Sequence, residues 1–541
     1  MVGPMVETIL SGLEALLERG RMDLALRLLL RPGVLPSIQA NASRLSPSSR
    51  QALANACLEQ GARSTAVALL AAGGPDDASA MNALAQVVTT QRCWDEALIV
   101  LPALAAAAPM NEQINGLLVF ALLETGNYAA AAVERDAYTA RRLAEMEASL
   151  PSLSATDAFS AAWHALMTGD GPLVRRWMAE HCIAATDAFD LAVDTARGLS
   201  SPGEPRPAAP AGPRRQLVLA MTVRDELDLI EANLAWHFAH GIDAAIVTDN
   251  GSRDGTRERL AALAERLPLV VIDEPVQDMD QSKWSTRMVW LAREAFGAEW
   301  VLLADADEFF HPTTGDYRTA IASATQGWFA DATILYIHCY LMLLDAEAGL
   351  AGAPPFHAAT HCLRHPLARW NHAYVSAGYN LLSVMTQIQK IWVRADSLPI
   401  VLPGNHLAIT HQPKLAPLVE VEGLHFSYRD FGRWHRKVTR FVEGFAQNSA
   451  PIDRPSVDYW RTNAPLWQQR ADAEAIYRRL QFGTAFHQWL KDQGRIIQRL
   501  DIAHLVERGL THSTPPFSPA EQQRCAEVLG TLDPRLPRCL R

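Results

Sequence analysis

The chain has 541 residues, of which 49% are hydrophobic and 20% are charged. This is the composition of a folded globular protein and excludes a disordered one, and the length predicts about two to four domains. The formal net charge of -10 argues against a surface that binds nucleic acid. The seven cysteines are scattered and include no C-x-x-C pair, which indicates a reducing compartment and neither a disulfide framework nor a zinc site.

Targeting signals are not recognisable in the sequence. Residues 1–20 lack a basic region followed by an apolar stretch, so no secretory signal is expected. No run of about 18 apolar residues occurs, so no transmembrane segment is expected. We therefore predict a cytoplasmic protein. Peripheral contact with the inner face of a membrane stays open, because it needs only a surface patch.

Residues 1–197 predict an all-α domain, because Ala and Leu dominate and apolar residues recur at spacings of three and four. Turns are expected at fairly regular intervals, at Gly20, Gly61, Gln91, Gly126 and Gly169. The pattern resembles degenerate tetratricopeptide-type (TPR-like) helical hairpins, whose period is about 34 residues. Stacked hairpins form either a concave surface that binds a protein partner or a bundle that only packs on its neighbour.

Residues 198–215 are rich in Pro, Gly and Ser and predict a linker. Strands and helices then alternate through residues 216–450, which predicts a mostly parallel sheet covered by helices. The parallel strands are expected at residues 216–222, 244–248, 269–273 and 300–304, and further strands are expected at 332–344 and 390–394. Ligands of such sheets bind at the carboxyl ends of the strands. Residues 451–541 predict a C-terminal helical region with helices at 467–480, 484–503 and 519–529.

Three polar motifs follow predicted strands: MTVRDE at residues 221–226, TDNGSRDGT at 248–256 and LLADADEFF at 302–310. If residues 301–304 form a strand, Asp305 and Asp307 point the same way at its carboxyl end. Two carboxylates on one side suit Mg²⁺ or Mn²⁺, which would bridge to phosphate oxygens of a substrate. The alternative is an acidic turn that caps the strand.

The order of these motifs resembles the family 2 glycosyltransferases of the nucleotide-sugar-dependent GT-A fold, closest to the subgroup with an R-x-E start and a D-x-D-E-F box. The resemblance implies an α/β GT-A domain and a metal-dependent glycosyltransferase of the hexosyltransferase class. Such an enzyme moves a sugar from a UDP- or GDP-sugar to a hydroxyl of a glycan, lipid-linked or protein acceptor, with inversion, in bacterial polysaccharide or glycan biosynthesis. The implied cofactor is Mn²⁺ or Mg²⁺.

The resemblance also implies a set of metal ligands. Asp307 is the main ligand, and Asp305 contacts the ribose or the metal. His425, in the segment GLHFSYRDFGRWHRKV, is the third ligand. In the same segment Arg429, Arg433 and Lys437 recur every four residues, so on a helix they form one basic stripe that faces either the diphosphate or water.

The implied nucleotide-sugar-binding residues are Thr222, Arg224, Asp249, Lys283, Arg287 and Asp305. Asp249 would accept from an N–H of the base, and Arg224 would bond phosphate or base unless it pairs with Glu226. Lys283 and Arg287 would hold the diphosphate, the alternative being that they face solvent.

An inverting transferase needs a general base, usually Asp or Glu. The family's acidic dyad is not recognisable here, and Asp345, Glu347 and Asp430 are the catalytic candidates. This departure leaves an inactive GT-A domain in a TPR-type scaffold as one alternative. A nucleotidyltransferase is another, but it would call for a glycine-rich first loop, and MTVRDE has no glycine.

Overall fold

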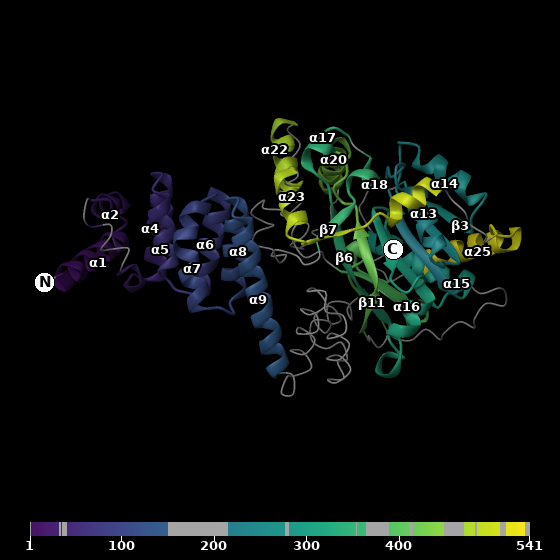
Figure 1. Cartoon of the computed structure of the whole chain (residues 1–541), viewed down its shortest axis with the longest axis horizontal. Helices are drawn as coiled ribbons and strands as arrows, with labels where there is room; N and C mark the ends of the chain where they lie inside the picture. Colours follow the sequence, from purple (N-terminus) through teal and green to yellow (C-terminus); the bar gives the residue numbers. More distant parts are fainter. Residues whose placement is uncertain are drawn as a thin grey trace. The chain divides into compact units, whose positions relative to one another are not determined.

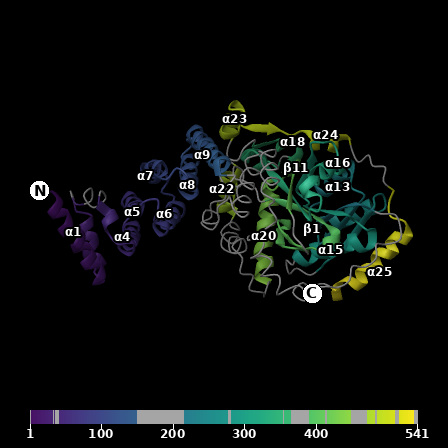
Figure 2. The same ribbon diagram turned by 90° about the horizontal axis from the view of Figure 1, so that it is seen from below.

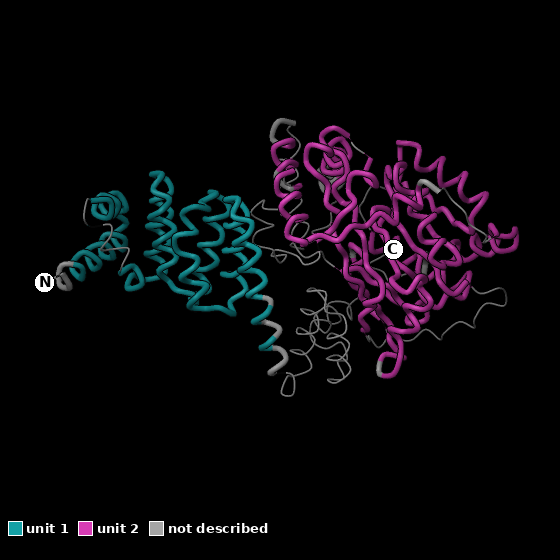
Figure 3. Tube along the Cα trace, viewed as in Figure 1, with its two compact units in different colours: residues 1–147, 366–381, 453–463 teal, residues 148–365, 382–452, 464–541 magenta. Residues whose placement is uncertain are grey.

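The computed structural model describes residues 2–31, 34, 41–149, 215–275, 281–352, 354–363, 389–410, 415–447, 470–481, 484–508 and 515–535. The chain divides into two compact units, the first built mainly from residues 1–147 and the second from residues 148–365, 382–452 and 464–541 (Figure 3). The predicted linker, apart from Arg215, and the turn predicted at Gly169 lie outside the described residues.

The described part of the first unit is helical (Figure 1). Its elements are α1 (Val2–Glu18), α2 (Met22–Leu29), the 3-10 helix η1 (Ala42–Arg44), α4 (Pro47–Glu59), α5 (Arg63–Ala71), α6 (Ala78–Gln91), α7 (Trp94–Ala107), α8 (Glu112–Glu124) and α9 (Tyr128–Ser149). Turns with positive φ occur at Gly20, Gly61 and Gly126, and at Arg92 directly after the predicted turn residue Gln91. The helices and these four turns are confirmed, whereas the tetratricopeptide assignment stays a prediction.

The second unit is built on a ten-stranded mixed sheet. Its strands are β1 (Leu217–Val223), β2 (Ala244–Asp249), β3 (Leu269–Asp273), β4 (Trp300–Asp305), β5 (Glu308–Pro312), β6 (Ile334–Leu343), β7 (His361–Leu363), β8 (Lys390–Arg394), β11 (Leu415–His425) and β12 (Ile496–Gln498). The order is β12-β7-β6-β8-β4-β1-β2-β3, and β11 pairs with β5 and β6. A separate pair consists of β9 (Ile400–Val401) and β10 (Ala408–Ile409).

The four parallel strands predicted from the sequence, β1 to β4, are all present, and they pair in parallel in the order β4-β1-β2-β3. The residues of β1, β2 and β4 are almost entirely buried, as expected for strands covered on both faces, whereas β3 is only partly buried. The sheet becomes mixed beyond β4, because β8 pairs antiparallel with both β4 and β6.

Helices connect and cover these strands (Figure 2). They are α13 (Ile230–Ala239), α14 (Thr256–Ala264), α15 (Gln281–Phe296), α16 (Tyr317–Ala324), η3 (Gly327–Phe329), α17 (Ala346–Leu350), α18 (Pro355–Ala358), η4 (Ala395–Ser397), η5 (Pro403–Asn405), α20 (Phe431–Gln447), α22 (Arg470–Gln481), α23 (Thr484–Asp492), α24 (Asp501–Arg508) and α25 (Pro519–Arg535). Within the described residues, no helix is long and apolar enough to span a bilayer.

The predicted helix 484–503 is wrong in its second half. Helix α23 ends at Asp492, and Gly494 turns the chain with a φ of +62°. The following residues form β12, which pairs with β7 at the end of the sheet. Helix α25 packs against α15, and Arg215 forms an ion pair with Glu521 at 2.9 Å. The described C-terminal elements are therefore part of the second unit.

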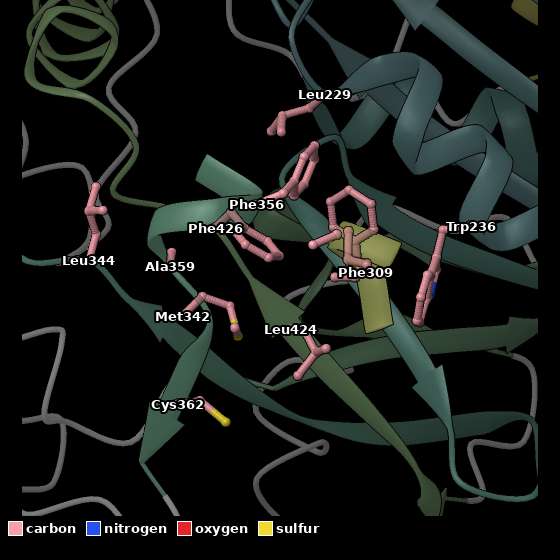
Figure 4. Packing of buried hydrophobic residues seen from close by; sticks show 12 residues of the cluster. Leu229, Trp236, Phe309, Met342, Leu344, Phe356, Ala359, Cys362, Leu424 and Phe426 are labelled. Atoms are coloured by element: carbon pink, nitrogen blue, oxygen red, sulfur yellow. The ribbon is translucent and has the colours of Figure 1, made fainter. Parts of the chain in front are cut away.

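An aromatic cluster holds β5 in place (Figure 4). Phe309 is fully buried, and its ring centroid lies 5.5 Å from that of Phe356 and 5.4 Å from that of Phe426. Trp236 of α13 packs against the same ring and donates its indole N–H to the carbonyl of Phe310 at 2.6 Å. Because Phe309 follows the D-x-D-E segment directly, this packing fixes the turn that carries the aspartates.

Candidate functional site

The strand register brings polar residues together at the carboxyl edge of the sheet. Thr222 of β1 is the partner of Thr248 in β2 and of Asp305 in β4. Neighbouring strands lie about 4.8 Å apart, so the row from Thr248 to Asp305 spans about 10 Å of backbone. The hydroxyls of both threonines are buried and have no hydrogen-bond partner among the described residues.

The D-x-D segment is a turn between two strands. Strand β4 ends at Asp305, Ala306 and Asp307 form the turn, and Glu308 begins β5. The alternation on which the same-side prediction rested therefore does not extend to Asp307. The carboxylate of Glu308 accepts the backbone N–H of Asp305 at 3.0 Å, which ties the two ends of the turn together.

Asp305 lies in a network centred on Lys390 of β8. The Lys390 ammonium contacts a carboxylate oxygen of Asp305 at 2.6 Å, the carbonyl of Gly404 at 2.8 Å and Glu308 at 3.0 Å. The other oxygen of Asp305 accepts from the side-chain amide of Gln281 at 3.3 Å. Burial lowers the pKa of Lys390, but the two carboxylates raise it more, so the pKa lies above its ordinary value and the lysine is charged.

Asp307 has different partners. Its carboxylate lies 3.0 Å from the ammonium of Lys437 and 3.4 Å from Nε2 of His425. Burial raises the pKa of Asp307, but Lys437 and His425 outweigh that effect and hold it well below its ordinary value. The structure thus brings together two of the three residues predicted to bind metal, Asp307 and His425.

The donor set does not fit a divalent cation held by Asp305, Asp307 and His425 together. Each aspartate has a lysine ammonium against its carboxylate, at 2.6 Å for Asp305 and 3.0 Å for Asp307. Among the described residues, no group of three or more His, Cys, Asp or Glu side chains converges as a metal site. Asp305, Asp307 and His425 therefore do not form a joint metal site in this arrangement.

The loop after β1 is held by buried ion pairs. The guanidinium of Arg429 lies 2.6 Å from Glu226 and 2.9 Å from Asp228. Burial raises the pKa of Glu226, and Arg429 partly offsets this. Arg224 therefore does not have the partner Glu226 that the sequence allowed. Its Nε is buried without a hydrogen-bond partner among the described residues, and burial and the charge of Arg440 lower its pKa.

The predicted basic stripe faces acidic loops rather than water. Arg429 precedes α20, whereas Arg433 and Lys437 lie within it. Arg433 pairs with Asp228 at 2.6 Å, and Lys437 pairs with Asp307. One turn further along the helix, Arg440 forms an ion pair with Asp225, a residue with a φ of +55° in the loop after β1.

Asp249 stabilises the loop after β2. Its carboxylate is fully buried, accepts the backbone N–H of Ser252 at 3.3 Å and lies 3.9 Å from Arg257. Burial raises its pKa. Asp254 holds the start of α14 by accepting the N–H of Thr256 at 3.0 Å. The base-binding role of Asp249 stays a prediction.

The two basic residues predicted on α15 have different surroundings. Arg287 is buried and pairs with Glu274 at 2.9 Å, so its charge is engaged by protein. Lys283 is half-buried. Neither lies in the Lys390 or Lys437 network, and their diphosphate role stays a prediction.

The three residues predicted as general bases have structural partners. Asp345 caps α17 by accepting the N–H of Glu347 at 2.9 Å. Glu347 is exposed and pairs with Arg478 at 3.0 Å. Asp430 accepts the N–H of Arg433 at 3.1 Å at the start of α20. Their catalytic role stays untested.

Lys390 and His406 are the site residues that the sequence analysis missed. Lys390 is the first residue of the predicted strand KIWVR. A lysine in a central strand must be paired with carboxylates, and this requirement is the sequence signal that could have identified Lys390. His406 donates its Nδ1–H to the Gln389 carbonyl at 2.7 Å, and burial together with the charge of Lys390 lowers its pKa to about 3. It is therefore a neutral neighbour of the network.

Comparison with protein-family models finds no match, and comparison with curated proteins finds none either. Among solved structures, residues 1–349 of S. aureus TarS match with 14% identity over 52% of this chain and 79% of that chain, at a TM-score of 0.24. A mannosyltransferase, PcManGT from Pyrobaculum calidifontis in complex with GDP-Man and Mn²⁺, matches with 14% identity over 64% of this chain and 93% of that one, at a TM-score of 0.23. These TM-scores are too low to support an inference about this chain.

Proposed function

We propose that the second unit is a glycosyltransferase that binds a nucleoside-diphosphate sugar at the carboxyl edge of β4, β1 and β2 and transfers the sugar to an acceptor hydroxyl. The observation that carries the proposal is Arg224. It follows β1 directly, its Nε has no partner among the described residues, and burial and the charges of Arg440 and Arg253 lower its pKa although the carboxylates of Asp225 and Glu443 oppose them. Like charges brought together at a partly buried site favour an anion, and arginine binds phosphate through paired N–H donors.

The remaining features of this edge support a nucleotide rather than a lone phosphate. The strand register places Thr248, Thr222 and Asp305 in one row over about 10 Å of this edge. Ligands of parallel sheets bind at this edge. The resemblance of the three motifs to nucleotide-sugar transferases assigns a UDP- or GDP-sugar as the donor and inversion as the outcome.

In this proposal the chain's own side chains bind and orient the donor. Arg224 donates to a phosphate oxygen, and the basic side chains of α20 balance the charge that develops on the departing diphosphate. The ion pairs of Glu226 and Asp228 with Arg429 hold the β1 loop in one conformation, which limits the reorganisation that binding requires.

The test is calorimetric titration of the full-length protein with UDP and GDP, followed by turnover assays with a panel of their sugars. Arg224→Ala should weaken nucleotide binding by about 10- to 100-fold, the value of one hydrogen bond to a charged group. Arg266→Ala, at an exposed arginine before β3, is the matched control and should bind as the unaltered protein does. Absence of nucleotide binding, or equal affinities of the two variants, would refute the proposal.

The same assays separate the alternatives. Turnover of any sugar in the panel rules out an inactive scaffold. Release of pyrophosphate from a nucleoside triphosphate and a sugar phosphate would instead favour a nucleotidyltransferase.

A further inference from the structure

The acidic D-x-D-E segment is already matched by fixed positive charges. Three carboxylates stand within four residues, at Asp305, Asp307 and Glu308. Lys390 contacts the first and third, and Lys437 contacts the second. A divalent cation binds where carboxylate oxygens are free to coordinate it. Here the ammonium groups lie against those oxygens.

From these contacts we propose that Lys390 and Lys437 supply the positive charge that a divalent cation would supply at this segment, so that the chain binds a nucleoside diphosphate without metal. This inference rests on the proposed function, because it concerns how the donor's diphosphate is held.

The two lysines differ in how many N–H donors of the ammonium group remain for a ligand. An ammonium group has three donors. Lys390 uses them on three oxygens, those of Asp305, Glu308 and Gly404, and its side chain is only 4% exposed. It therefore neutralises the carboxylates permanently and fills the space between Asp305 and Glu308 that a metal would need.

Lys437 is the lysine that can reach a ligand. Its side chain is 36% exposed, and among the described residues its hydrogen-bond acceptor is one oxygen of Asp307 at 3.0 Å. Two donors of the ammonium remain for an incoming anion. His425 lies 3.4 Å from the other oxygen of Asp307, so the carboxylate keeps a neighbour when Lys437 turns toward a ligand.

Helix α20 continues this positive charge from the end of β4 to the end of β1. Lys437 and Arg440 are three residues apart and share a helix face. Lys437 contacts the turn after β4, and Arg440 contacts Asp225 in the loop after β1, close to the charge of Arg224. A diphosphate at this edge would therefore meet three cationic side chains, Lys437 and Arg440, each paired with one aspartate, and Arg224.

The experiment compares nucleotide binding with and without metal. The full-length protein is dialysed against EDTA and titrated calorimetrically with UDP and GDP, in EDTA and then in excess Mn²⁺. We expect the dissociation constants in the two buffers to agree within about threefold. In EDTA, Lys437→Met should weaken binding by about 10-fold or more, and Lys437→Arg should retain it, because the charge remains.

Lys491→Met, at an exposed lysine of α23, is the matched control and should leave the affinity unchanged. Far-ultraviolet circular dichroism verifies that each variant is folded. Nucleotide binding that is more than about 10-fold tighter in Mn²⁺ than in EDTA would overturn this inference and leave the proposed function standing. Equal affinities of Lys437→Met and the unaltered protein would also overturn it. No nucleotide binding in either buffer would overturn the proposed function itself.

Discussion

Replacing Arg429 with methionine tests the network that holds the β1 loop. Arg429 is 5% exposed and neutralises Glu226 and Asp228, whose side chains are 13% and 12% exposed. Removing one partner of a buried ion pair typically costs about 3–5 kcal/mol. Arg433 still lies 2.6 Å from Asp228, so Glu226 is the carboxylate left without a partner. We therefore expect a loss near the lower limit, about 3 kcal/mol at pH 8.

The loss should depend on pH in a defined direction. Burial already raises the pKa of Glu226, and Arg429 opposes that rise, so its removal raises the pKa further. The folded variant then binds a proton more tightly than the unfolded chain, and its stability falls as the pH rises. Below the raised pKa, and down toward the ordinary glutamate value, the deficit should shrink by up to about 1.4 kcal/mol per pH unit.

Urea unfolding of the full-length protein between pH 5 and pH 8, followed by tryptophan fluorescence, measures both effects. Adding Glu226→Gln to Arg429→Met should remove the pH dependence of the deficit. Arg478→Met is the surface control, because Arg478 forms an exposed pair with Glu347, and it should unfold as the unaltered protein does. A loss below about 1 kcal/mol for Arg429→Met, or a deficit that grows on acidification, would refute the reasoning.

Two further variants test the packing beneath the site. Phe309→Ala removes a fully buried ring in contact with other aromatic rings, so urea unfolding should show a loss of about 3–5 kcal/mol, and a loss below about 1.5 kcal/mol would contradict that packing. Gly423→Ala would place a Cβ 2.5 Å from the sulfur of Cys339, so we expect the free energy of unfolding to fall by about 1–3 kcal/mol in the same assay. The second substitution Cys339→Ala should partly relieve this loss. Independent, additive losses would show that the two positions do not clash.

The parallel half of the fold was predictable because its signals are local. Four short apolar runs, each ended by a polar loop, matched β1 to β4 closely, and β8 (Lys390–Arg394) coincided with the run KIWVR. The apolar runs at β6 and β8 were predicted as strands, whereas β5, β7, β11 and β12 were not. Their pairing depends on partners distant in sequence, and Ile496 and Ile497 follow a helical pattern until Gly494 interrupts it.

The position of the candidate site's loops was predictable, but the ion-pair partners of their side chains were not. Each motif identified a loop at the carboxyl edge, and that location is where the structure has Asp305, Asp307, Arg224 and Asp249. The spacing of residues in the sequence does not indicate which lysine or arginine neutralises which carboxylate. Asp305 and Lys390 are 85 residues apart. The expected alternation of side chains does not apply to Asp307, because the strand ends at Asp305 and the chain turns at Ala306 and Asp307.

A rule about buried charge would have recovered much of what the motifs missed. The β1 loop and the D-x-D-E turn place Asp225, Glu226, Asp228, Asp307 and Glu308 where water has little access. Buried carboxylates must have cationic or hydrogen-bonding partners. The segment 429–440 carries Arg429, Arg433, Lys437 and Arg440 at helical spacing, and these four side chains supply partners for Glu226, Asp228, Asp307 and Asp225. These contacts make Arg429 and the helix α20 that follows it the segment that stabilises the β1 loop and, in our proposal, the segment that binds a diphosphate.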